Sequence, residues 1–179
     1  MVIGVPFLVY GVRQYPTHGF AGQTLVGLFG FLIVTWLATN FLGLCGGWGL
    51  KEKLGRLLHL ERPFDKTEKH FVGFARPSYS GLLDPHEDVG YLLVHDDNLE
   101  FFGGTQRISL EKASVKKIGF RANPHSVLGL GRWVSVEAVV KEKPVRFLVE
   151  PREKSTLIGN VFYGTRLRKR LEAWFDSKI

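Results

Sequence analysis

Charged side chains are missing from one long stretch of this 179-residue chain. Between Gln14 and Leu50 there is no Asp, Glu, Lys or Arg, and residues 24–44 form a nearly continuous apolar run. A helix of about 20 apolar residues crosses the roughly 30 Å hydrocarbon core of a bilayer. Apolar side chains would cover every side of such a helix, and a domain of this size has no core that could surround it. The sequence therefore predicts a transmembrane helix in residues 21–47.

Cysteine is almost absent as well. Cys45 is the only one, so the chain can form no intramolecular disulfide and carries no sign of a disulfide-built secreted domain. The apolar stretch makes a poor signal peptide, because it has no basic start and no cleavage site with small residues. Leu44 precedes Cys45 where a lipoprotein signal has a small residue, which argues against lipidation.

Positive charge is unevenly placed around the predicted span. The net charge is +7, but only Arg13 precedes the span, whereas Lys51, Lys53 and Arg56 follow it directly. Positively charged flanks stay in the cytoplasm. The sequence thus predicts a single-pass protein of the cell membrane with its C-terminal domain in the cytoplasm. The short turns of that domain favour a bacterial inner membrane.

Two shorter segments flank the span and leave alternatives open. Residues 1–20 start with an apolar stretch too short to span alone. This stretch either forms a hairpin with the span or lies at the membrane interface. Residues 48–69 carry leucines among charges at near-helical spacing, which predicts an amphipathic helix ended by Pro63. That helix either lies on the bilayer or packs on the next domain.

The remaining residues, 70–179, form the predicted soluble domain, because the hydrophobic period changes there from helical to two. Short alternating segments joined by turns are typical of antiparallel barrels and sandwiches. After Ser155, which we expect to be an N-cap, helical spacing returns and predicts a C-terminal helix that closes the barrel. The predicted strands are 71–77, 89–95, 99–102, 107–110, 114–121, 132–140 and 145–151.

Part of this domain resembles a known family. The stretch GYLLVHDDNLEFFGGTQRISLEKASVKKIGF resembles the core of GRAM and bacterial pleckstrin-homology (PH)-like domains. The resemblance extends over residues 70–176 and implies a mainly-β, PH-like domain of about seven antiparallel strands closed by a helix. Because its motifs are apolar patterns, it implies little about function. The residues that carry it are Gly90, Leu92, Leu99, Phe101, Ile108, Leu110, Val115 and Ile118.

Residue types used in catalysis and metal binding occur near the second strand. They lack a recognisable metal-ligand spacing, and His95 to Asn98 separate two apolar runs, which predicts a hairpin turn. Neither a Gly-x-Ser-x-Gly motif nor a strand-to-helix glycine loop is present. We therefore predict no catalytic residue, no metal and no cofactor, and leave a metal-dependent enzyme as the least favoured alternative. The residues weighed were Asp84, His86, Glu87, Asp88, His95 and Asp97.

Basic residues form the candidate surface for a lipid or a partner. Some PH-like domains bind phosphoinositides through a basic loop between their first two strands, but residues 77–88 here contain acids and no Lys or Arg. Attraction to anionic lipid would therefore depend on other cations. The candidate residues are Lys116, Lys117, Arg121, Arg166, Arg168, Lys169 and Arg170.

The expected function is binding. We predict a membrane-anchored cytoplasmic module that holds a protein partner or acts as a scaffold, with anionic-lipid binding as the alternative. Nucleic acid is not expected as a partner, because a membrane span lies next to the basic domain. Apolar residues in the loops are expected either to form the partner surface or to belong to the core; they are Tyr79, Leu82, Leu83, Leu128, Leu130 and Trp133.

Overall fold

A computed structural model of the chain describes residues 5–18, 22–42, 47–62, 67–77, 86–123, 126 and 129–177. The chain divides into two compact units, Met1–Cys45 and Gly46–Ile179. The first unit contains helices α1 (Val5–His18) and α2 (Gly22–Leu42). The second contains a seven-stranded sheet and the remaining helices.

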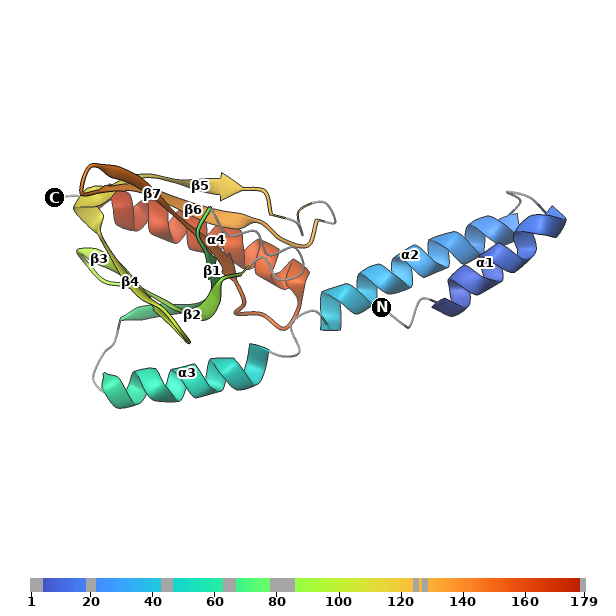
Figure 1. Ribbon diagram of the computed structural model, residues 1–179, viewed down its shortest axis with the longest axis horizontal. Coiled ribbons are helices and arrows are strands. Elements are labelled where there is room, and N and C mark those ends of the chain that lie inside the picture. The colour runs from blue at the N-terminus through green and yellow to red at the C-terminus, as the bar shows by residue number, and fades with distance from the viewer. Residues whose placement is uncertain are drawn as a thin grey trace. The chain divides into compact units, whose positions relative to one another are not determined.

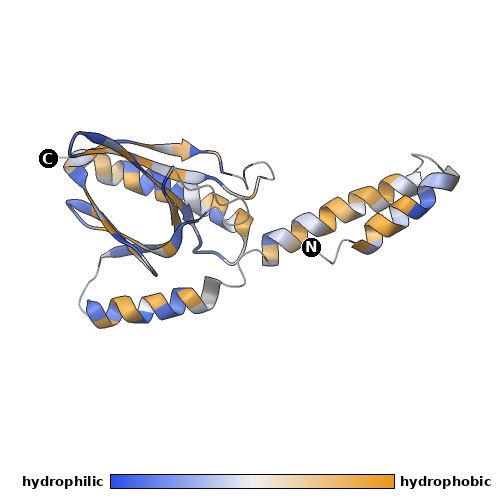
Figure 2. Cartoon of the chain, in the orientation of Figure 1, coloured by the Kyte–Doolittle hydropathy of each residue, from blue (hydrophilic) through white to orange (hydrophobic). Residues whose placement is uncertain are grey.

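Helix α2 corresponds to the predicted span. It has 21 residues, which at about 1.5 Å per residue gives roughly 31 Å, the thickness of a hydrocarbon core. Figure 2 shows α2 coloured as apolar along most of its length. In the described part of the chain, its segment Thr24–Phe41 is the one helical stretch long and apolar enough to cross a membrane.

Helix α1 packs antiparallel against α2 through glycines. The backbones of Gly11 and Gly27 approach so closely that a Cβ at Gly27 would lie 2.5 Å from the Cα of Gly11. One turn away, Gly30 makes room for the ring of Phe7. Small residues allow helix backbones to pack tightly, which is the main source of helix association in lipid. Of the two alternatives for the N-terminal stretch, the structure therefore has the hairpin.

We predict that Gly27→Leu separates α1 from α2, because its side chain would collide with the backbone of α1. The pair Phe7→Cys and Gly30→Cys, in a Cys45→Ser background, should be joined by a short bis-maleimide in the parent chain. Adding Gly27→Leu should lower the yield of this cross-link severalfold, as measured by mass spectrometry. Gly22→Leu is the control, since a side chain at Gly22 meets nothing within 4 Å. Equal yields in both variants would contradict the glycine contact.

The second unit contains seven antiparallel strands, as predicted. They form one sheet in the order β4-β3-β2-β1-β7-β6-β5. Lys141 and Glu142 join β6 to β7, and both are at positive φ, as a type I′ hairpin turn requires. The strands are β1 (Glu68–Ala75), β2 (Asp88–Val94), β3 (Asn98–Gly103), β4 (Arg107–Glu111), β5 (Val115–Arg121), β6 (Trp133–Val140) and β7 (Lys143–Pro151).

The sheet is open but strongly curved. β4 and β5 are its two edges, yet only the short 3-10 helix η2 (Lys112–Ser114) separates them along the chain. In a flat seven-stranded sheet these edges would lie roughly 29 Å apart. Since a three-residue link spans at most about 14 Å, the sheet must curl until its edges approach each other at η2. Figure 1 shows this curvature.

The C-terminal helix α4 (Leu157–Asp176) fills the concave side of the sheet. Leu167, Leu171 and Trp174 are buried in one core cluster with residues of all seven strands. The predicted helix is confirmed, but its N-cap is wrong by one residue. Thr156, not Ser155, caps the helix, because its side chain accepts a hydrogen bond from the N–H of Gly159.

Helix α3 (Gly47–Glu61) covers part of the convex side of the sheet. Leu54 and Leu58 are buried against side chains of β1, β2 and β3. Ion pairs hold both ends of the helix: Lys51 lies 2.6 Å from Glu153, and Glu61 makes two hydrogen bonds to Arg107. The inner face of this segment therefore packs on the domain, which is one of the two alternatives that the sequence left open.

Candidate functional site

The residues His95, Asp96 and Asp97 form the turn between β2 and β3. The N–H of His95 donates to the carbonyl of Asn98 at 3.0 Å, and the carbonyl of Asp97 accepts from the N–H of Lys112 at 2.7 Å. The indole N–H of Trp174 donates to the carbonyl of His95 at 2.6 Å. These contacts use the backbone of the turn and attach it to η2 and α4. The predicted hairpin turn is confirmed.

Two other acidic residues weighed as metal ligands, Glu87 and Asp88, have structural partners of their own. The carboxylate of Asp88 accepts hydrogen bonds from the backbone N–H groups of residues 104–106 and so shapes the β3–β4 turn. Glu87 pairs with Arg76 and Gln106. Asp84 lies outside the described residues. Within the described ranges, no group of three His, Cys, Asp or Glu residues is arranged to hold a metal ion.

The ion pair between Glu87 and Arg76 makes stability depend on pH. The hydrogen bond from Arg76 lowers the pKa of Glu87 from 4.5 to about 2. A carboxylate whose pKa is lowered by folding stabilises the folded state at pH values above the pKa of the unfolded chain. This contribution is lost as the pH falls through the pKa of the folded state. The relevant window is therefore 4.5 down to about 2. Arg76 is half exposed, so screening limits the contribution to about 1 kcal/mol or less.

We predict that Glu87→Gln flattens the acid limb of the stability profile. The free energy of unfolding of the full chain in detergent should fall less between pH 4.5 and about 2 in this variant than in the parent. Denaturant unfolding followed by tryptophan fluorescence measures the difference. Glu142→Gln, on the exposed β6–β7 turn, should leave the profile unchanged. Parallel profiles of Glu87→Gln and the parent would contradict the role of this ion pair.

A buried polar cluster, which sequence analysis missed, lies beside β1 and β7. The side chain of His86 is 1% exposed, and its Nε2 lies 2.9 Å from a carboxylate oxygen of Glu150. Arg152 approaches the Nδ1 atom of His86 at 2.7 Å, and the amide of Asn123 donates to Glu150 at 2.7 Å. Because a guanidinium can only donate, Nδ1 of His86 is the acceptor in the contact with Arg152.

This cluster joins the β5–β6 connection and the residues before β2 to β7. Asn123 also accepts from the N–H of Ser126, and Ser126 is bonded to the carbonyl of Gly131, so the β5–β6 connection is tied to β7. His86 packs edge-on against Trp133. No sequence signal could have revealed the cluster, because its members come from separate loops and from β7.

Gly73 leaves the space that His86 occupies, which generates a stability prediction. A Cβ at Gly73 would overlap the imidazole ring, whereas a Cβ at Gly119 meets nothing within 4 Å. Gly73→Ala should therefore lower the free energy of unfolding by about 1–3 kcal/mol through overpacking. Gly119→Ala, also in a strand, should be neutral or slightly stabilising. Denaturant unfolding of both variants tests this contact, and equal stabilities would contradict it.

The predicted basic residues do not form one surface. Arg121 pairs with Glu137, which also pairs with Arg146, and Lys116 lines a groove near this pair. Arg170, in contrast, bonds to Glu68 at the start of β1, on the flank of α4 where Tyr163 meets the buried His70. Burial lowers the pKa of His70. The seven residues thus fall into two groups: Lys116, Lys117 and Arg121 on β5, and Arg166, Arg168, Lys169 and Arg170 on α4.

Arg168 belongs to a second feature that the sequence did not reveal. Its guanidinium lies 4.8 Å from the ring centroid of Phe120, and that of Arg132 lies 3.8 Å from the same ring. Arg132 also donates to the hydroxyl of Thr165. Two cation–π contacts on one phenyl ring fasten α4 to the edge strand β5. Arg168 therefore has a structural contact in addition to its charge.

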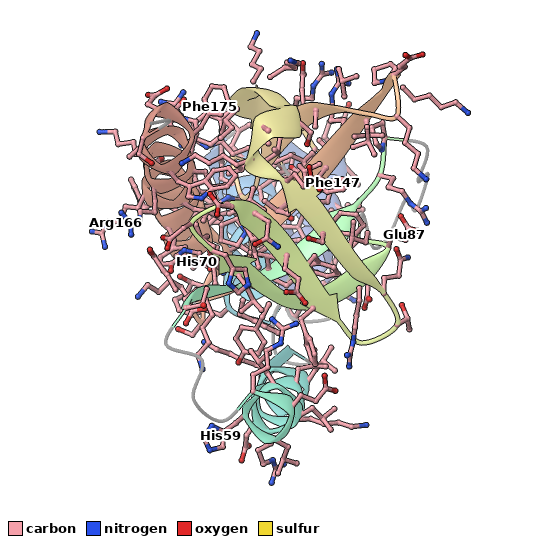
Figure 3. The ribbon with its side chains drawn as sticks, turned by 90° about the vertical axis from the view of Figure 1, so that its left-hand side faces the viewer. His59, His70, Glu87, Phe147, Arg166 and Phe175 are labelled. Atoms are coloured by element: carbon pink, nitrogen blue, oxygen red, sulfur yellow. The ribbon has the colours of Figure 1, made fainter. Side chains whose placement is uncertain are left out.

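An exposed apolar and basic face remains on α4. Phe162 is 68% exposed and Ile158 is 36% exposed. Arg166 and Lys169, both exposed, follow at helical spacing on the same side of the helix. In the view of Figure 3, Arg166 projects from α4 into solvent at the left-hand edge. We call Ile158, Phe162, Arg166 and Lys169 the α4 face.

The apolar loop residues do not add to this face. Leu130 and Trp133 are 1% and 5% exposed and belong to the protein interior, which was the second reading of these residues. Tyr79, Leu82, Leu83 and Leu128 lie outside the described residues.

Neither the protein-family models nor the curated proteins include a match to this chain.

Proposed function

We propose that this protein is a membrane-anchored, non-catalytic binding module whose PH-like domain holds a protein partner at the cytoplasmic surface of the cell membrane. The observation that carries this proposal is the α4 face, where a largely exposed phenylalanine lies among cations. Large exposed apolar side chains next to polar ones are typical of interaction surfaces. The charge of Arg166 and Lys169 favours a partner with carboxylates.

The anchor is α2, and the link to the domain is short. Residues 43–46 separate α2 from α3, and a link of this length reaches at most about 18 Å. Helix α3 is packed on the sheet and held by ion pairs, so the domain itself begins soon after the span in the sequence. The excess of Lys and Arg after the span supports a cytoplasmic location for the domain.

A PH-like fold is supported by strand order and by the helix. Seven consecutive antiparallel strands, a curled sheet and a C-terminal helix on its concave side are the features that the family resemblance implies. A non-catalytic role is supported by the histidines and acids near β2, since those described have structural partners.

Anionic lipid is the second candidate ligand, favoured by a groove beside α3.

A photo-crosslinking experiment tests the partner site. A photoreactive phenylalanine analogue at position 162 of the full chain should form a discrete adduct in native membranes. The same analogue at position 140, where Val140 is 39% exposed on the β6–β7 hairpin, is the matched control and should form none. Arg166→Glu should lower the adduct yield at position 162 severalfold, because a like charge would then face the acidic partner.

Two outcomes would contradict the proposal. Adducts of equal yield at positions 162 and 140 would indicate collision with neighbouring proteins rather than a site. An adduct at position 162 that Arg166→Glu leaves unchanged would exclude an acidic partner at this face.

A further inference from the structure

We propose that the groove between α3 and the start of β1 binds the phosphate group of an anionic lipid headgroup. The groove has a volume of about 770 Å³. This site is separate from the α4 face. It rests on the proposed function in one respect, because it requires that α2 is a membrane anchor. Its lining residues from α3 are Gly49, Lys51, Glu52, Gly55, Arg56, His59 and Leu60, and those from the sheet are Lys69 and Tyr91.

The groove owes its depth to a glycine. Gly55 faces the hydroxyl of Tyr91, and a Cβ at this position would already lie 3.1 Å from that oxygen. The Tyr91 hydroxyl donates to the carbonyl of Lys51 at 3.0 Å, which holds the ring against α3. A larger side chain at position 55 would therefore occupy the groove without changing any charge in it.

The charges that line the groove favour an anion. Lys51 is paired with Glu153 at 2.6 Å. Arg56 is only weakly paired with Glu52, at 4.0 Å and with both side chains 72% exposed. The side chains of Lys69 and His59 are exposed and make no hydrogen bond or ion pair with any described residue. Two cations and a histidine thus face one carboxylate, and phosphate oxygens accept charge-assisted hydrogen bonds from such groups.

The position of the groove favours a lipid over a free anion. It begins within the first turn of α3, at Gly49, and only residues 43–46 separate α3 from the apolar α2. Leu60, which is 76% exposed, adds an apolar wall to the groove. A headgroup phosphate with acyl chains nearby would meet both the cations and this leucine, whereas free phosphate would use only the cations.

Native mass spectrometry of the full chain in detergent tests the site. Phosphatidylglycerol should be retained more strongly than phosphatidylcholine during titration. Lys69→Glu should weaken phosphatidylglycerol binding about tenfold through the loss of a charge-assisted contact. Gly55→Leu, which keeps all charges, should weaken it as well. The matched control is Lys53→Glu, which makes the same charge change on α3 outside the groove and should have little effect.

Three other results would contradict the proposed lipid site. Equal weakening by Lys53→Glu and Lys69→Glu would mean diffuse attraction to a basic helix. Phosphatidylcholine carries the same phosphate, offset by the choline cation, so equal retention of the two lipids would mean that the groove does not select a headgroup with net negative charge. Inorganic phosphate that displaces phosphatidylglycerol at equal concentration would assign the groove to a soluble anion. Because Lys69 is exposed, its variant tests the site even where Gly55→Leu disturbs folding. None of these results depends on the photo-crosslink at position 162.

Discussion

The constraint on which the second unit depends is the three-residue connection between its two edge strands. Because η2 alone separates β4 from β5, the sheet has to curl, and curling gives it a concave and a convex side. The concave side encloses Leu167, Leu171 and Trp174 of α4. Burial of this apolar area is the main source of stability for a domain without disulfides. The cation–π contacts of Phe120 and the hydrogen bond from Trp174 to the β2–β3 turn then fix the middle and the C-terminal end of α4.

The convex side explains why α3 belongs to the domain. Leu54 and Leu58 cover Phe71, Tyr91, Leu93 and Phe102, which would otherwise form an exposed apolar patch. The same helix leaves Leu57 and Leu60 exposed, at 41% and 76%. An amphipathic helix normally has one apolar face, whereas α3 has apolar residues both toward the sheet and toward its surroundings. Only four residues separate this segment from the apolar helix α2 in the sequence.

The polar residues near β2 illustrate how a cluster of reactive residue types can be structural. Asp88 organises a turn, Glu87 pairs with Arg76, and His86 joins Glu150 and Arg152 in a buried network. Buried polar groups need such partners, because an unpaired one costs about 1–3 kcal/mol. Their chemistry is thus used to hold loops to strands. Among the described residues, the side chains of Arg166 and Lys169 on α4 and of Lys69 on β1 have no ion pair, and these cations contribute to both binding proposals.

Local pattern was enough to predict much of this protein. The apolar run predicts a helix long enough to span a membrane, and alternation predicts seven strands to within a few residues, because both depend on neighbours in the chain. The N-cap was misplaced by one residue, since Ser155 and Thr156 are both good caps and only the backbone decides between them. Tertiary structure alone decided that Gly11 meets Gly27, that His86 meets Glu150, that the basic residues separate, and that Lys69 joins α3 in a groove. These contacts join residues far apart in sequence, and those within the second unit depend on the order in which the strands pair, which no local pattern encodes.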